Sequence, residues 1–374
     1  MTKGDRIGAA VVAILLFFAL IPLVLHGVRS NPAVRGGLAL SEDLPQQVPP
    51  GVTLAIGDPM TQQVLAYTGW ERELPFTVRW ANITGGPATT EAFHARAIDV
   101  GSGANIPPIR AIWVGIPVKI IAVRLRQQPL LHPIYVLGVA PKADVKTLAD
   151  LRGKRIAFSP GQAQGVVVLR ALHAAGLTPA DVTLVDLPTT RINNYNGALG
   201  AGIVDVAPIA SGALAARYLA EWGSSGGTVI DHGAFRDDPD VLYVRTETLQ
   251  NPAKAAALQA YVRMWARVAA WRDAHPDEWA RLYYVKFLGL SPDAAWAEVK
   301  RAGHADIPHD WSWMVGYQQE TIDLLAKETG RHSFDAEHLF DRRFESVATD
   351  GFANYTAPAM QEKSRLNHQE NGAL

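Results

Sequence analysis

The sequence contains no cysteine among its 374 residues. This absence excludes disulfide bonds, a thiol nucleophile, cysteine-ligated zinc and a cysteine-anchored lipid. A strong charge of either sign is also missing, because 35 Lys and Arg residues face 36 Asp and Glu residues and leave a net charge of -1. Without a basic surplus there is no electrostatic reason to expect a nucleic-acid partner.

Common motifs for nucleotide binding and metal-dependent hydrolysis are missing as well. Neither of the chain's two glycine-rich strand-to-helix turns fits G-x-G-x-x-G, and neither ends in the Gly-Lys-Ser/Thr of a phosphate-binding loop. No H-E-x-x-H occurs, and the 11 histidines are scattered along the chain. We therefore expect no catalytic residue, no metal site and no cofactor.

A long apolar run is present near the N-terminus, at residues 7–28, flanked by basic residues. About 20 apolar residues can cross a bilayer, whereas the apolar part of a secretory signal has about 7–15. Residues 1–30 therefore predict a membrane anchor, with a cleaved signal peptide as the alternative. Either interpretation places the body of the protein outside the cytoplasm, in the periplasm or on the outer face of the membrane. Residues 31–50, rich in Pro, Gln and Gly, are expected to be a linker.

The body of the chain alternates between strand and helix patterns up to about residue 231. Strand patterns occur at residues 52–57, 76–80, 97–100, 118–123, 134–139, 155–158, 182–186, 204–208 and 228–231. Helices are expected between them, for example at 60–67, 166–175 and 194–201. Such alternation predicts an α/β fold with largely parallel sheets.

From about residue 252 to residue 328 nearly every segment has helical period instead. The dipeptides His275-Pro276 and Ser291-Pro292 each predict the start of a new helix. Seven of the ten tryptophans lie between positions 222 and 313, and at helical spacing they are expected to pack in the core.

Two strand-to-helix junctions predict places where a small anion could bind. The first comprises Ser102, Gly103 and Asn105, and the second comprises Gly161, Gln162 and Ala163. We interpret each as a glycine turn that aims free backbone N–H groups and the positive end of a helix dipole at one point. Glycine-rich turns are also common in α/β folds without any ligand, so simple topology remains the alternative for each.

The order and the residue patterns of these segments resemble those of the substrate-binding proteins of ABC importers for sulfonates, taurine and nitrate. The matching motifs are Ala-Ile-Asp-Val-Gly-Ser at 97–102, Gly-Ile-Pro-Val-Lys-Ile-Ile-Ala at 115–122, Leu-Ala-Asp-Leu-Arg-Gly-Lys at 148–154 and Gly-Ile-Val-Asp at 202–205. The resemblance covers about residues 52–221, and the helical remainder agrees in type.

The resemblance implies the type II periplasmic-binding-protein fold, in which two lobes close on a ligand that lies between their helix N-termini. Each lobe would hold a mostly parallel sheet flanked by helices, and two crossing strands near 134–139 and 240–244 would join them. The lobes would then comprise residues 51–137 and 241–349 for the first and 138–240 for the second, followed by a polar tail at 350–374.

Three further ligand contacts follow from this resemblance and from the pattern of donors. Related proteins use the loop after Gly57, where this chain has Asp58, although Asp58 followed by Pro59 also predicts an ordinary helix N-cap. Asn194 lies at another strand-to-helix junction, with an amide suited to an oxyanion. Ser211 lies in a segment where relatives commonly carry tryptophan, so we expect a roomier pocket here.

The sequence therefore favours a monomeric extracytoplasmic solute-binding protein that is not an enzyme. It would bind a small oxyanion-containing organic ligand, of the sulfonate, taurine or nitrate type, and deliver it to an ABC permease and its ATPase. A membrane-tethered receptor that senses a ligand is the alternative. An enzyme like the iron-dependent synthases of the thiamine pyrimidine is a lesser alternative, because those use a cysteine-rich motif and this chain has no cysteine.

Overall fold

The computed structural model describes residues 37–83, 85–187 and 195–355. The apolar segment predicted at residues 7–28 lies outside these ranges. Within them, no helix combines the length and the apolar composition that crossing a membrane requires.

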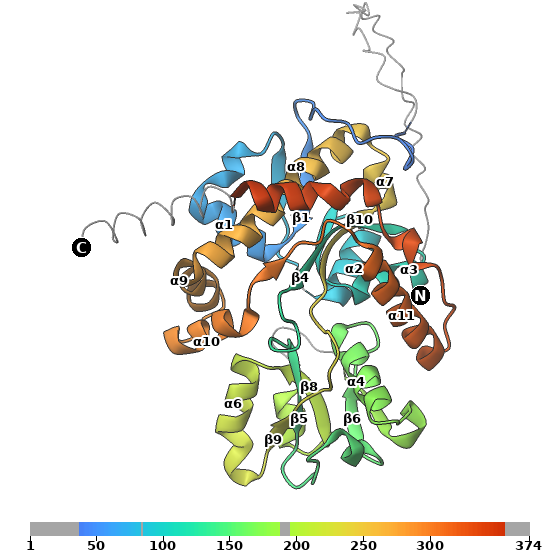
Figure 1. Ribbon diagram of the computed structural model, residues 1–374, viewed down its shortest axis with the longest axis vertical. Coiled ribbons are helices and arrows are strands. Elements are labelled where there is room, and N and C mark those ends of the chain that lie inside the picture. Colours follow the sequence, from blue (N-terminus) through green and yellow to red (C-terminus); the bar gives the residue numbers. More distant parts are fainter. Residues whose placement is uncertain (1–36, 84, 188–194, 356–374) are drawn as a thin grey trace, which may run out of the picture. The chain divides into compact units, whose positions relative to one another are not determined.

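The first of two sheets has six strands (Figure 1). They are β1 (Thr53–Gly57), β2 (Thr77–Trp80), β3 (Val100–Ala104), β4 (Val118–Arg126), β10 (Asp240–Arg245) and β11 (Ala305–Asp306). Their spatial order is β11-β4-β10-β3-β1-β2. Strand β1 pairs in parallel with β2 and β3, whereas β10 runs antiparallel between β3 and β4.

The second sheet has five strands, in the order β7-β6-β8-β5-β9. They are β5 (Tyr135–Val139), β6 (Arg155–Phe158), β7 (Thr183–Asp186), β8 (Val206–Ala210) and β9 (Thr228–Ile230). Strand β6 pairs in parallel with β7 and β8, whereas β5 runs antiparallel to β8 and β9.

Both sheets are therefore mixed, and the prediction of mostly parallel sheets needs correction. The reason is the path of the chain, which passes from the first sheet to the second and back. Strands β5 and β10 are the first strands after these two passages, and each enters its sheet against the direction of the strands beside it. Local βα alternation predicts parallel pairs but says nothing about a strand that arrives from another sheet.

The helices follow the predicted boundaries closely. Those that flank the two sheets are α1 (Pro59–Thr68), α2 (Gly86–His94), α3 (Ile106–Trp113), α4 (Ala163–Ala174), α5 (Asn196–Gly200) and α6 (Ala213–Trp222). The helical part holds α7 (Thr246–Leu249), α8 (Pro252–Ala274), α9 (Pro276–Trp279), a π-helix (Ala280–Phe287), α10 (Pro292–Ala302) and α11 (Ser312–Thr329). Short 3-10 turns occur at Trp70–Glu73, Leu148–Leu151, Pro179–Asp181, Gly223–Ser225, Ala336–Leu339 and Arg342–Phe344, and residues 345–355 are helical.

Proline and capping residues explain where several of these helices begin. Helices α9 and α10 start at Pro276 and Pro292, as the sequence predicted. The hydroxyl of Ser291 accepts a hydrogen bond from the Ala294 N–H and so caps α10.

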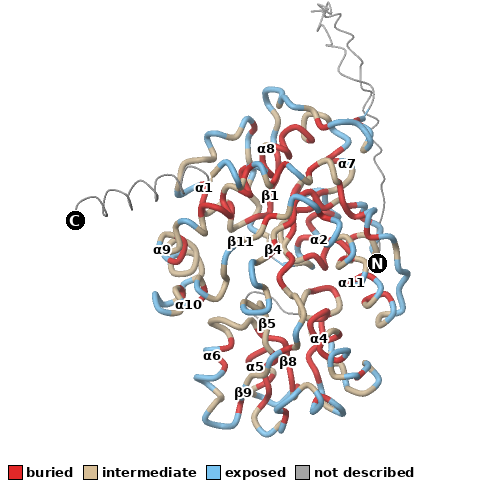
Figure 2. The backbone as a smooth tube through the Cα atoms, in the orientation of Figure 1, coloured by how far each residue is buried: buried red, intermediate tan, exposed pale blue. Residues whose placement is uncertain are grey.

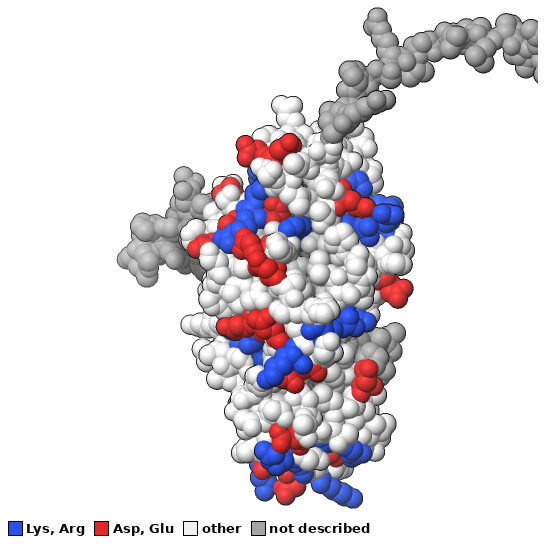
Figure 3. Space-filling view, turned by 90° about the vertical axis from the view of Figure 1, so that its right-hand side faces the viewer, with Lys and Arg blue, Asp and Glu red and all other residues white. Residues whose placement is uncertain are grey.

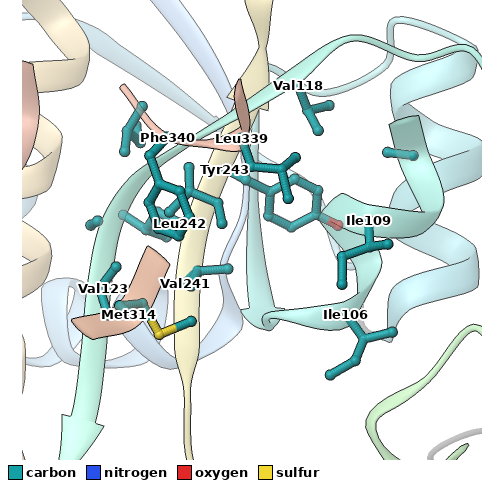
Figure 4. Packing of buried hydrophobic residues seen from close by; sticks show 14 of the residues in the cluster. Ile106, Ile109, Val118, Val123, Val241, Leu242, Tyr243, Met314, Leu339 and Phe340 are labelled. Carbon is teal, nitrogen blue, oxygen red and sulfur yellow. The ribbon is translucent and has the colours of Figure 1, made fainter. Parts of the chain in front are cut away.

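The core contains buried hydrophobic residues of both sheets, and Figure 2 shows many of them along β1, β4 and α8. In Figure 4, Tyr243 extends from β10 toward Ile109 of α3. Trp265 and Trp311 are fully buried, which confirms the prediction that tryptophans of the helical part pack in the core. Trp313 departs from that prediction, because it is 49% exposed.

The two passages between the sheets lie side by side and are hydrogen-bonded to each other. The first, residues 127–134, joins β4 to β5, and the second, residues 231–239, joins β9 to β10. The carboxylate of Asp237 accepts hydrogen bonds from the N–H groups of Ile134 (2.9 Å) and Tyr135 (2.8 Å). The crossings thus come just before the segments at 134–139 and 240–244, which lie mainly within the sheets.

Candidate functional site

A cavity of about 300 Å³ lies beside these two passages. Its walls come from the end of β4, the starts of α1 and α4, the end of α8 and the segment before α11. Its lining residues are Met60, Ala104, Arg124, Leu125, Arg126, Ile134, Tyr135, Ala163, Asp237, Asp238, Pro239, Asp240, Ala269, Arg272, Asp273, Tyr284, Ala302, Gly303, His304 and Ala305. Both sheets therefore contribute to one cavity.

The acidic side chains of the second passage make hydrogen bonds that fix part of the cavity lining. Asp238 accepts a hydrogen bond from the N–H of Arg126 (2.6 Å) and two from the guanidinium of Arg236 (2.7 and 2.8 Å). Its neighbour Asp237 also lies 3.0 Å from the Nε2 of His232. These carboxylates are occupied with backbone and side-chain donors, so their role is to fix the two passages relative to each other.

Arginines form the cationic part of the lining. Arg124 pairs with Asp240 and lies 4.9 Å above the ring of Trp265. Arg126 donates from Nη1 to the carbonyl of His132 at 2.7 Å. Burial lowers the pKa of Arg126 to about 10, and the charge of Arg301 adds to this shift.

Arg272, near the end of α8, lines the same cavity and packs 4.4 Å from the ring of Trp279. Burial lowers its pKa below the usual value, and the charge of Arg124 contributes in the same direction. Charges of both signs intermingle on the face of the molecule seen in Figure 3. That face therefore carries no broad basic surface.

Two carboxyl groups of the lining have raised pKa values. Burial raises the pKa of Asp240 even though Arg124 acts in the opposite direction. Burial also raises the pKa of Asp273, whose carboxylate accepts a hydrogen bond from the N–H of Ala305 at 2.8 Å. The cavity therefore contains acids that gain a proton at a higher pH than an exposed aspartate does.

The second predicted junction reaches this cavity. Strand β6 ends at Phe158, α4 begins at Ala163, and Ala163 lines the cavity. Gly165 must be glycine here, because a Cβ at that position would lie 2.2 Å from the carbonyl oxygen of Ser159. Gly161 and the buried Gln162 complete the turn, and the hydroxyl of Ser159 donates to Oε1 of Gln162 at 2.6 Å.

The first predicted strand-to-helix junction is present, because α3 begins at Ile106 directly after Asn105, but the glycine turn expected before it is part of a strand. Ser102 and Gly103 lie inside β3, where they pair with Leu242 and Val241 of β10. The neighbouring Gly101 makes room for α2, since a Cβ there would approach Cγ2 of Thr89 to 2.6 Å. Gly101 thus serves close packing between β3 and α2.

The remaining predicted residues lie in several places. Asn105 is buried and exchanges hydrogen bonds with Gln318 of α11 at 2.6 and 2.8 Å. Asp58 caps α1 by accepting from the Thr61 N–H at 3.3 Å, and it also accepts from the hydroxyl of Tyr261 at 3.0 Å. Asp58 as a helix N-cap was the alternative interpretation of the sequence, and it is confirmed.

Ser211 lies at the end of β8, where its hydroxyl donates to the carbonyl of Pro133 at 2.6 Å and accepts from Arg301 at 3.1 Å. Asn194 lies outside the described residues. Of the predicted ligand contacts, Ala163 is the one that lines the cavity within the described part of the chain. All of them stay predictions as ligand contacts.

The cavity's arginines were missed at the sequence level, although β4 carried a signal for two of them. Arg124 and Arg126 interrupt the apolar end of a buried strand at positions i and i+2, which places both on one face of the sheet. Polar residues at the carboxyl end of such a strand are typical of ligand sites in α/β folds. Arg272 had no comparable signal, because it is one of several arginines on a long helix.

Comparison with known proteins identifies the family of this chain. The chain belongs to the family described as NMT1/THI5 like, whose model matches residues 82–279, more than half of the chain. A protein of Escherichia coli (strain K12), named for binding aliphatic sulfonates, is 35% identical over 105 residues. That match covers 28% of this chain and 32% of the relative, so the chain matches about a third of the relative's length.

Solved structures show the fold. The periplasmic aliphatic sulphonate binding protein SsuA of Escherichia coli superposes with a TM-score of 0.63 at 22% identity, over 77% of this chain and 91% of that one. The desulfurization enzyme DszB superposes with a TM-score of 0.52 at 16% identity, over 80% of this chain and 99% of that one. This chain therefore has the α/β periplasmic-binding-protein fold, which carries both binding proteins and an enzyme.

Proposed function

We propose that this protein is the solute-binding component of an ABC importer for a small sulfonate-like anion. The observation that carries the proposal is the cavity to which both sheets contribute. Its lining includes two arginines at the end of β4 and the first residue of α4, Ala163. Backbone N–H groups at a helix start and guanidinium groups are both suited to an oxyanion. The names of the related sulfonate-binding proteins support the same ligand class.

Contacts between the two sheet regions support binding by closure, as in a type II periplasmic binding protein with two lobes. Arg170 of α4 donates to the hydroxyl of Thr321 on α11 at 3.0 Å and lies 4.5 Å above the ring of Tyr317. The hydroxyl of Tyr317 in turn donates to the carbonyl of Arg236 in the second passage, at 2.5 Å. A solute in the cavity would favour the state in which such contacts form, and a permease with its ATPase would recognise that state.

An extracytoplasmic location belongs to the same proposal. The apolar segment at residues 7–28 supports export, with the segment acting either as an anchor or as a signal peptide. The sulfonate-binding relative of known structure is described as periplasmic.

Binding to the purified full chain tests the proposal. We expect one-site binding of an alkanesulfonate or of taurine by calorimetry, with the ligand recovered unchanged by mass spectrometry. At 100 times its dissociation constant such a ligand should stabilise the fold by about 2.7 kcal/mol. A chemically altered ligand would instead indicate an enzyme, and a lack of binding to every sulfonate tested would contradict the proposed function.

A further inference from the structure

The guanidinium group of Arg272 lies in the cavity wall and has no hydrogen-bond partner among the described residues. Its Nε is buried and unpaired, and no hydrogen bond or ion pair joins its side chain to another residue in the part of the chain that the structure describes. The ring of Trp279, 4.4 Å away, covers one face of the group. A guanidinium carries five N–H donors in a fixed fork, and no described residue accepts a hydrogen bond from those of Arg272.

Other arginines near this site differ from Arg272 because each of them donates at least one hydrogen bond. Arg124, in the same cavity, pairs with Asp240, and Arg126 donates to a backbone carbonyl. Arg267 lies five positions earlier on α8, pairs with Glu73 at 2.5 Å and covers the ring of Trp70 at 3.6 Å. Helix α8 thus carries a paired arginine away from the cavity and an unpaired one in the cavity wall.

The acids around Arg272 do not satisfy it. Asp273, the next residue, directs its carboxylate to the N–H of Ala305. Asp240 is held by Arg124. An unpaired, partly buried cation is costly to keep, and an oxyanion that accepts two of its N–H groups would remove that cost. The lowered pKa of Arg272 agrees with a group that lacks a compensating anion.

The surroundings also limit the charge that such a ligand can carry. Four carboxyl groups line the same cavity, namely those of Asp237, Asp238, Asp240 and Asp273. A dianion bound at Arg272 would therefore meet nearby negative charge at short range, whereas a monoanion would meet half as much repulsion. Met60, Leu125 and Ala269 offer apolar surface for a short alkyl tail.

We propose that Arg272 is the side chain that binds the ligand's head group, and that this head group is a monoanionic oxyanion such as a sulfonate. The inference rests on the proposed function. It assigns the recognition step to α8, which lies far in sequence from both predicted glycine junctions.

Calorimetry with butanesulfonate on the full chain tests the role of Arg272. Arg272→Gln should weaken binding by about 10- to 100-fold, the range expected for losing hydrogen bonds to a charged group. Arg267→Gln is the matched control on the same helix and should bind as the wild type does. Equal affinities for Arg272→Gln and the wild type would overturn the inference, and so would an equal loss in both variants.

Two further measurements keep the test decisive. Arg272→Lys keeps the charge but loses the two-pronged geometry, and it should fold and bind several-fold more weakly; wild-type affinity would contradict guanidinium recognition. Butyl phosphate loses its second proton near about pH 6, so its affinity for the wild type should fall between pH 5 and pH 8 more than that of butanesulfonate. If the dianion of butyl phosphate binds as tightly as its monoanion, the monoanion assignment is overturned. A wild-type chain that binds no sulfonate would contradict the proposed function instead.

Discussion

The N-termini of α4 and α6 follow neighbouring strands of the second sheet, yet they face different surroundings. Helix α4 begins at the cavity, which Ala163 lines. Helix α6 begins against Glu298 of α10, whose carboxylate accepts a hydrogen bond from the N–H of Ala213. Arg301 then joins Glu298 to the carbonyl of Pro133, which it contacts at 3.2 Å.

The difference shows that a helix N-terminus can serve either ligand binding or stability. Both helix starts favour a negative charge, because the positive end of the helix dipole lies there. At α6 the chain supplies that charge itself and so connects the helical part to the second sheet. At α4 the structure leaves a cavity with arginines beside the helix start. Changes near α6 should therefore affect stability first, and changes near α4 should affect ligand binding.

Removing the carboxylate at α6 should have the largest effect. Glu298→Ala leaves Arg301 without its acid and the first turn of α6 without an acceptor, with side chains only 9% and 21% exposed. We expect a loss of about 2–4 kcal/mol in the free energy of unfolding, measured by urea denaturation. Glu320→Ala, at a carboxylate that is 72% exposed, should change it by less than about 0.5 kcal/mol. Similar losses of unfolding free energy in the two variants would contradict a special stabilising role of Glu298 at the start of α6.

A side chain that crowds the turn before α4 should have the second-largest effect. Gly165→Ala places a Cβ 2.2 Å from the backbone oxygen of Ser159, so α4 must shift at its start. We expect about 1–3 kcal/mol of destabilisation together with weaker sulfonate binding, followed by thermal unfolding and calorimetry. Gly197→Ala is the control, because a Cβ there meets nothing within 4 Å. Unchanged sulfonate affinity in Gly165→Ala would show that the start of α4 does not belong to the ligand site.

Ser211→Ala should have a smaller effect on the α6 side. The change removes the hydrogen bond to Pro133 and the one from Arg301. Its cost should be about 0.5–1.5 kcal/mol in unfolding free energy, with sulfonate affinity kept within about twofold. A large loss of affinity would show that Ser211 contacts the ligand, as the sequence predicted.

The pH dependence of binding should be the smallest effect. Burial raises the pKa values of Asp240 and Asp273, so on acidification these groups gain protons at a higher pH than an exposed aspartate does. Each proton removes a negative charge from the cavity, so sulfonate affinity should rise, by less than about tenfold in total. Calorimetry at several pH values measures this change. Affinity that falls on acidification would contradict the location of the site.

The sequence was informative wherever the deciding contacts are local. The start of α1 after Asp58 and the start of α10 after Ser291 were predictable because a cap and a proline lie within four residues of each other. The turn before α4 was found for the same reason. Gly103 was misassigned because its partner, Val241, lies far along the chain, and a glycine in a strand resembles a glycine in a turn.

Arg272 and Glu298 could not be assigned from the sequence. Both lie on helices with several charged residues, and only the packed structure shows which charge is paired. Sequence spacing determines which face of a helix a residue occupies, but not what that face meets.

The position of β10 has a consequence for how the chain is made. Strands β3 and β4 do not pair with each other, because β10 lies between them. A chain growing from its N-terminus therefore cannot connect β3 to β4 through β10 until residue 245 has been synthesised, after the whole second sheet. Until then β3 and β4 keep unpaired edges, so the nascent chain stays open for most of its length. Under the extracytoplasmic location proposed above, late insertion of this central strand would postpone the compact state until after most of the chain has been synthesised.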